Sequence, residues 1–290
     1  MRARYLGSIL VAVTTLGVAA CGDSGHSPAP AASPPVAPGP AAATPGPTTG
    51  QSAAAKVPTA PSPTRLLMRE HFQKATEARL ALISDDIEGA RAAMAWLANN
   101  DPSQGELPAS LRPHLDGMRE KARAFATART FTEAGDAFAV TLTQCGECHA
   151  AADRGPTFAE VPAPQGNELR DRMHKHAWAA ERMWEGLVLR DQPRYDAAAS
   201  SLADVVVRVD ELPPHEGEPA RIQAIADNVR SLAATGLHAT DWPGRAQAYG
   251  RFLATCATCH RIMGVGARVG GVLRQAPPPA PLPAPQPAAP

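Results

Sequence analysis

The sequence predicts an all-α protein of two tandem four-helix bundles, flanked by disordered segments rich in proline and alanine. Three observations support this fold class. An internal repeat divides the chain into two copies, at residues 64–156 and 167–265. Apolar residues in each copy recur at helical spacing between candidate helix caps. Aromatic residues make up only 4% of the chain whereas alanine is abundant, which favours close-packed helices over a β-sandwich.

Residues 1–20 have the pattern of an export signal. Arg2 and Arg4 precede a mostly apolar stretch that is short for a membrane span. The stretch ends at Ala20-Cys21 and resembles a bacterial lipoprotein signal, in which the cysteine becomes the first residue of the mature protein and carries lipid. Ordinary cleavage after Ala20 would instead leave Cys21 as a free thiol. We expect lipidation of Cys21, which gives a durable membrane anchor.

Two further segments are expected to remain disordered. Residues 21–63 and the tail at residues 275–290 are dominated by proline, alanine and other small residues, which cannot form a core. The first would act as a tether between the lipid and the folded part. The chain has 28 basic and 28 acidic residues, and this zero net charge gives no argument for a nucleic-acid partner.

The repeat can be followed residue by residue. Met68 and His71 correspond to Met173 and His176, and Asp86 corresponds to Asp191 at the same spacing. The final segments correspond at a slightly longer spacing: Phe138, Leu142, Cys145 and His149 with Tyr249, Leu253, Cys256 and His260. Each copy therefore contains one set of predicted helices, four in number.

The helices of the first copy are expected at residues 65–84, 86–99, 111–128 and 130–152. Asp85 is the expected cap of the second helix, with Glu88 as its capping-box partner, and Thr130 with Glu133 should cap the fourth. Candidate caps in the second copy are Asn167, Asp191 and Asp241. Three prolines occupy expected first-turn positions: Pro193, Pro219 and Pro243.

One pentapeptide pattern, Cys-x-x-Cys-His, occurs on the last predicted helix of each copy, at residues 145–149 and 256–260. It is the attachment motif of a c-type haem, in which two thiols form thioethers and the adjacent imidazole binds iron. A redox Cys-x-x-Cys, or one zinc site shared by four thiolates, needs no histidine after both pairs. We expect two covalently bound haems c, with His149 and His260 as proximal iron ligands. The expected haem-binding residues are Cys145, Cys148, His149, Cys256, Cys259 and His260.

The first helix of each copy carries a methionine and a histidine one turn apart, on the face that should meet the haem. We expect His71 and His176 to be the distal iron ligands, because neutral imidazole binds haem iron readily. Ligation by Met68 and Met173, or an open distal site, are the alternatives.

A four-helix bundle with Cys-x-x-Cys-His near its end resembles the cytochrome c prime family, here with two haem domains in tandem. In that family the first helix meets the distal haem face; some members leave the iron open to small gases, and others supply a methionine and carry electrons. This chain departs from the family in placing a histidine as well as a methionine there, and in lacking the aromatic and arginine residues often found just after the haem histidine.

The resemblance and the export signal together predict a dihaem cytochrome c that carries electrons between redox proteins in the periplasm and is not an enzyme. The alternative is a gas-binding protein for NO or CO with an open distal site. A dihaem peroxidase would need unequal haems, and the near symmetry of the copies argues against it. The predicted location is the membrane surface facing the periplasm, and Gly22 after the cysteine points weakly to the outer membrane.

Overall fold

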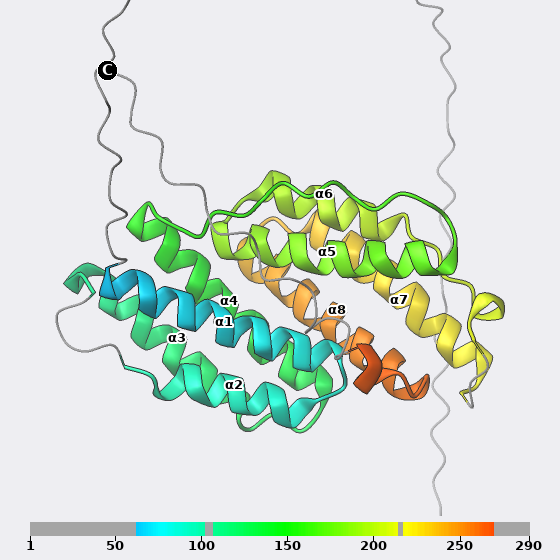
Figure 1. Cartoon of the computed structure of the whole chain (residues 1–290), viewed down its shortest axis with the longest axis horizontal. Coiled ribbons are helices and arrows are strands. Elements are labelled where there is room, and N and C mark those ends of the chain that lie inside the picture. Colours follow the sequence, from blue (N-terminus) through cyan, green and yellow to red (C-terminus); the bar gives the residue numbers. More distant parts are fainter. Residues whose placement is uncertain (1–61, 102–106, 214–216, 270–290) are drawn as a thin grey trace, which may run out of the picture. The chain divides into compact units, whose positions relative to one another are not determined.

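The computed structural model describes residues 62–101, 107–213 and 217–269, and over these residues the fold is all-helical (Figure 1). The first copy contains α1 (Pro63–Ile83), α2 (Ile87–Asn99), the 3₁₀-helix η1 (Ala109–Leu111), α3 (Arg112–Phe125) and α4 (Phe131–Ala152). The second copy contains α5 (Leu169–Leu189), α6 (Gln192–Ala203), the 3₁₀-helix η2 (Val209–Glu211), α7 (Pro219–His238) and α8 (Trp242–Ile262).

The expected export signal, the lipidation site Cys21, most of the tether and the proline-rich tail lie outside the described residues. Within the described part, none of the helices combines the length and apolar character needed to cross a bilayer.

Several helix ends follow from the caps expected from sequence. Thr130 and Glu133 form a reciprocal capping box at the start of α4. Asp191 accepts a hydrogen bond from the Arg194 amide at the start of α6, and Asp241 does the same for Gly244 at the start of α8. These carboxylates satisfy amides that a helix N-terminus leaves without partners.

Other expected boundaries are wrong. The cap of α2 is Asp86, whose carboxylate accepts from the Gly89 amide at 2.8 Å. Asp85 instead lies in the left-handed region with φ 64°, because it carries the chain out of α1. The cap of α5 is Glu168 and not Asn167.

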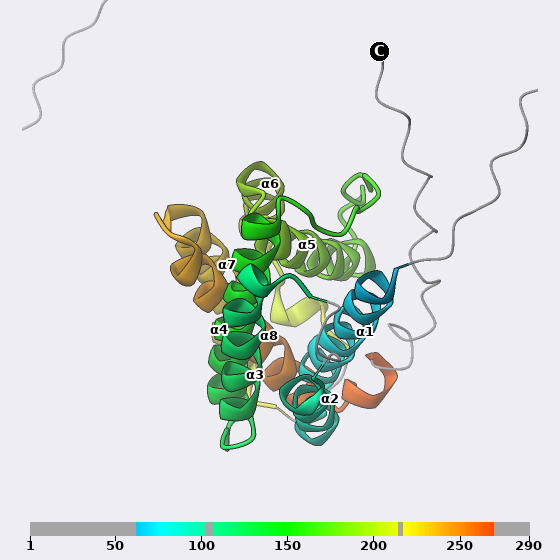
Figure 2. The same cartoon turned by 90° about the vertical axis from the view of Figure 1, so that its left-hand side faces the viewer.

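Consecutive helices pack side by side within each copy, α1 to α4 and α5 to α8. The most extensive packing in the molecule, however, joins the copies, because α4 lies along α8 (Figures 1 and 2). In addition α1 contacts α8, and α5 contacts α4. The described part of both copies therefore belongs to one compact unit.

The α4–α8 contact is close because two glycines face each other. A Cβ atom on Gly135 would overlap the carbonyl oxygen of Gly250, and a Cβ on Gly250 would overlap that of Gly135. Any larger side chain would push the helices apart, so the crossing depends on glycine at both positions.

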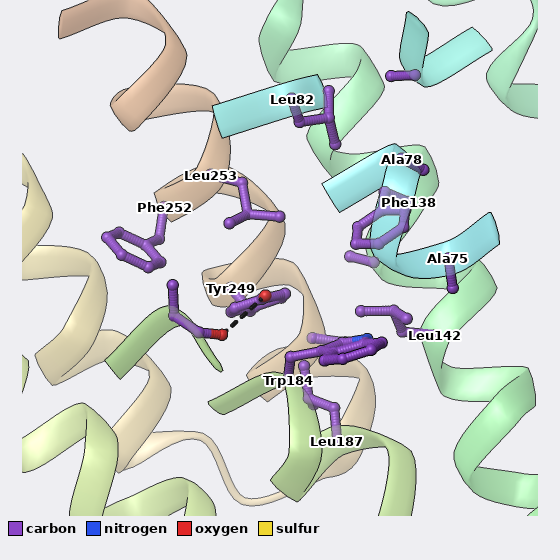
Figure 3. Close-up of a cluster of buried hydrophobic side chains, with 14 of the residues drawn as sticks. Ala75, Ala78, Leu82, Phe138, Leu142, Trp184, Leu187, Tyr249, Phe252 and Leu253 are labelled. Atoms are coloured by element: carbon purple, nitrogen blue, oxygen red, sulfur yellow. Dashed lines mark hydrogen bonds between the residues drawn. The ribbon is translucent and has the colours of Figure 1, made fainter. Parts of the chain in front are cut away.

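The hydrophobic core also spans both copies (Figure 3). The side chains labelled there come from α1, α4, α5 and α8, and further members of the same core come from α2, α3, α6 and α7. At its centre Arg79 of α1 lies over the ring of Trp184 of α5, 4.6 Å from the ring centroid, and pairs with Glu181 at 2.5 Å. Tyr249 of α8 donates a hydrogen bond to the carbonyl of Ala180 at 3.0 Å. Arg79 and Trp184 occupy equivalent positions of the repeat, so this pair marks where the two copies meet.

Candidate functional site

Both Cys-x-x-Cys-His motifs lie in the last two turns of a long helix, α4 or α8. The apolar stripe that leads to each motif is buried: Phe138 and Leu142 on α4, and Tyr249 and Leu253 on α8, are at most 1% exposed. The motif residues themselves are half-buried at the end of this stripe. A group attached to these thiols would therefore lie beside the end of a buried apolar stripe.

The histidine of each motif is oriented by a helix of the other copy. Nδ1 of His149 lies 3.0 Å from the carbonyl oxygen of Val188 in α5. Nδ1 of His260 lies 2.6 Å from the carbonyl oxygen of Ile83 in α1. A carbonyl only accepts, so each Nδ1 carries the proton, and the Nε2 lone pair is left for a metal ion.

The two acceptor carbonyls belong to the last turns of their helices, where a carbonyl has no amide four residues further along the helix. Ile83 and Val188 are equivalent in the repeat, as are His260 and His149. The two contacts are therefore one arrangement, made twice in a reciprocal manner across the junction between the copies.

The thiols are suited to a structural role. Burial, with a smaller contribution from Cys148, raises the pKa of Cys145 to about 12, and burial likewise raises the pKa of Cys256. Burial also raises the pKa of Cys148 and Cys259. A reactive redox cysteine has the opposite shift, since the thiolate is the nucleophile. All four thiols are free, and among the described residues no three His, Cys, Asp or Glu side chains gather as ligands for a single metal ion.

His176 of α5 lies near the motif of its own copy. Its Nε2 atom is buried and has no hydrogen-bond partner. Burial, and secondarily the charge of His260, lower the pKa of His176 to about 4. A buried imidazole nitrogen without a partner is costly, unless it binds a group that the protein alone does not contain.

His71 of α1 has different surroundings. Its Nε2 lies 3.3 Å from the side-chain nitrogen of Asn100, and its ring meets Trp96 edge-on with centroids 5.6 Å apart. Burial, and secondarily the charge of Arg119, lower the pKa of His71 to about 4. Trp96 belongs to α2, Asn100 follows the last residue of α2, and Arg119 belongs to α3. Among the described residues, no hydrogen bond or ring contact joins His71 to His149.

The alternative ligands Met68 and Met173 are half-buried on α1 and α5. His174 is exposed, as its helical angle from His176 predicts. The assignment of a distal iron ligand to any of these residues stays a prediction.

Sequence reasoning missed the residues that support the histidines. The carbonyls of Ile83 and Val188 carry no side-chain signal, although their equivalence in the repeat was a clue. Asn100 and Trp96 were not singled out, although the repeat replaces them with Val205 and Ser201 in the second copy.

The residues present fit two covalently attached haems. Cys145 with Cys148, and Cys256 with Cys259, would hold the macrocycles, and the free Nε2 atoms of His149 and His260 would bind iron. No family model, no curated protein and no solved structure matches this chain.

Proposed function

We propose that the chain is a dihaem c-type cytochrome that carries electrons between other redox proteins. In this proposal each copy is a four-helix bundle with its own haem, and α4 and α8 bring the two bundles together. The main support is the pair of hydrogen bonds from Nδ1 of His149 and His260 to backbone carbonyls. They set the tautomer and ring direction that a proximal haem ligand requires.

The protein's own groups have three roles at each site. The paired thiols, Cys145 with Cys148 and Cys256 with Cys259, would hold each haem through two thioethers, formed by addition of each S–H across one vinyl group without oxidation. The carbonyl of Val188 or Ile83 raises the basicity of the histidine that it orients. The buried apolar stripes on α4 and α8 would provide a water-free surface beside each attachment site.

When bound, haem supplies reversible one-electron chemistry at iron. Ligand type and burial are the features that set the potential of each haem.

The proposed location follows from the sequence before residue 62. A lipid on Cys21 and the proline-rich tether would hold the helical part near a membrane, facing the periplasm, the compartment in which c-type haems are attached. Partners would be other redox proteins that reach the half-exposed motif edges.

The attachment is tested by expressing the full chain with its export signal in a bacterium that has the haem c maturation machinery. A pyridine haemochrome assay should give two haems c per chain. The double variants Cys145→Ala/Cys148→Ala and Cys256→Ala/Cys259→Ala should each retain one. A wild-type chain exported without covalent haem contradicts the proposal.

Electron transfer is tested separately on the haem-loaded protein. A potentiometric titration should show two reversible one-electron steps, and the reduced protein should pass electrons to a small oxidised cytochrome. One observation favours a gas-binding function. Nε2 of His71 accepts a hydrogen bond from the Asn100 side chain, so this atom is not free to bind iron and close the distal site.

A further inference from the structure

The two histidines expected on the distal faces are equivalent in sequence and unequal in structure. His71 and His176 occupy the same position of the first helix of each copy. One has its Nε2 atom in a hydrogen bond, and the other has its Nε2 buried without any partner.

The hydrogen bond of His71 uses the lone pair that iron would need. The side-chain nitrogen of Asn100 only donates, so Nε2 of His71 must accept. The ring is held further by its edge contact with Trp96, and Arg119 approaches from α3. To reach an iron atom at His149, His71 would have to break this hydrogen bond and leave Asn100 without it.

The second copy lacks the groups that hold His71. At the positions of Asn100 and Trp96 it has Val205, which has no side-chain donor, and Ser201, which has no ring. Val205 is 5% exposed, and its side chain offers no hydrogen bond in place of the Asn100 amide. Nε2 of His176 is buried without a partner, and the ring lies close enough to His260 for the charges of the two rings to interact.

We propose that the two haems are ligated unequally. His176 closes the distal face of the haem on Cys256 and Cys259, whereas Asn100 holds His71 away from the haem on Cys145 and Cys148, whose iron stays open to a small exogenous ligand. This proposal rests on the proposed haem-binding function. It makes Asn100 a positioning residue, which acts through His71.

The test uses the full chain with both haems, counted first by pyridine haemochrome. The ferric protein should show one low-spin and one high-spin haem by electron paramagnetic resonance, and the reduced protein should bind one CO per chain. A count of fewer than two haems contradicts the proposed function itself. A count of two with none or two CO bound contradicts only the unequal ligation.

Three variants locate the effect. His176→Ala should raise CO binding from one to two per chain, and His71→Ala should leave it at one. Asn100→Val introduces the residue found at this position in the second copy and should free Nε2 of His71 to bind iron. CO binding should then fall toward zero, and both haems should become low-spin.

Two results would overturn the proposal. One is a rise in high-spin signal or CO binding in His71→Ala. The other is a near-infrared methionine–iron band that disappears in Met68→Leu, since it would mean that a protein ligand already closes the first haem. If Asn100→Val does not fold, Asn100→Ala with the same readouts replaces it.

Discussion

The two halves of the chain share their proximal arrangement and differ around the histidine of their first helix. His149 and His260 each donate to the last turn of a helix in the other half, at equivalent carbonyls. His71 lies against Asn100 and Trp96, while Nε2 of His176 has no partner. The backbone contacts of the two motif histidines are therefore symmetric between the copies. The surroundings of the two first-helix histidines are not, because their side-chain neighbours differ.

The junction shows the same contrast. Asp85 and Arg190 are equivalent, and both lie in the left-handed region just after a first helix. Asp85 pairs with Arg261 at 2.8 Å, whereas Arg190 pairs with Glu147 at 3.4 Å. Each half thus contacts the helix that carries the other half's Cys-x-x-Cys-His motif by an ion pair, and the two pairs have opposite polarity.

The largest effect is expected at the glycine crossing that holds the halves together. Gly250→Ala and Gly135→Ala place a methyl group against the carbonyl of the opposing glycine. Each should destabilise the protein by about 1–3 kcal/mol, the usual cost of overpacking, as measured by urea unfolding. Both haem spectra should change, since the carbonyls that orient the histidines move with α1 and α5.

Gly117→Ala is the matched control. Its added methyl group meets only the end of the flexible Gln144 side chain, and alanine favours a helix over glycine by about 1 kcal/mol. Equal losses of stability at Gly117 and Gly250 would mean that the crossing of α4 and α8 has no special role.

The next effect, which appears only as pH is raised, is expected from a buried acid present in only one half. Glu185 is 2% exposed in its side chain and pairs with Arg182 at 2.5 Å and Arg194 at 2.8 Å, whereas its equivalent in the first half is Leu80. Burial raises the pKa of Glu185 to about 7 despite the two arginines. The Glu185 carboxyl group therefore holds its proton more tightly in the folded protein than in the unfolded chain.

The stabilisation from that proton is complete below about pH 4.5 and is lost as pH rises through about 7. The stability of wild type relative to Glu185→Gln should fall by on the order of 2 kcal/mol between pH 5 and 8. Urea unfolding across this range measures it, with Glu70→Gln on the exposed side of α1 as control. A difference that stays constant with pH contradicts the assignment.

The smallest effect is expected at the ion pair between Asp85 and Arg261. Its charges are partly exposed, so a double-mutant cycle with alanine should give a coupling below about 1 kcal/mol that weakens at high salt. Coupling well above this value would mean that the pair, and not the helix packing, orients α8 against α1.

The order of the helices was predictable from the sequence, because helical spacing and capping residues are local signals. Thr130, Asp191 and Asp241 cap the helices that they were expected to cap. The choice of Asp85 over Asp86 was wrong, although the repeat pairs Asp86 with Asp191, which caps α6. Comparison of the two copies was the better guide there than the local capping-box pattern.

The support of the sites could not be predicted in the same way. The motifs and the histidines of the first helices could be located in the sequence. The partners of His149 and His260, however, are backbone atoms brought close by the packing of α5 against α4 and of α1 against α8. The engagement of His71 depends on Asn100, at the end of the next helix. Such contacts follow from tertiary packing, which helical spacing does not reveal.

The most direct measurement is the intact mass of the denatured full chain after export from a host with the haem c maturation machinery. We expect a mass increase of two haems that survives denaturation, and of one haem in Cys145→Ala/Cys148→Ala. Free polypeptide with no added haem, from cells that mature other c-type cytochromes, would contradict it.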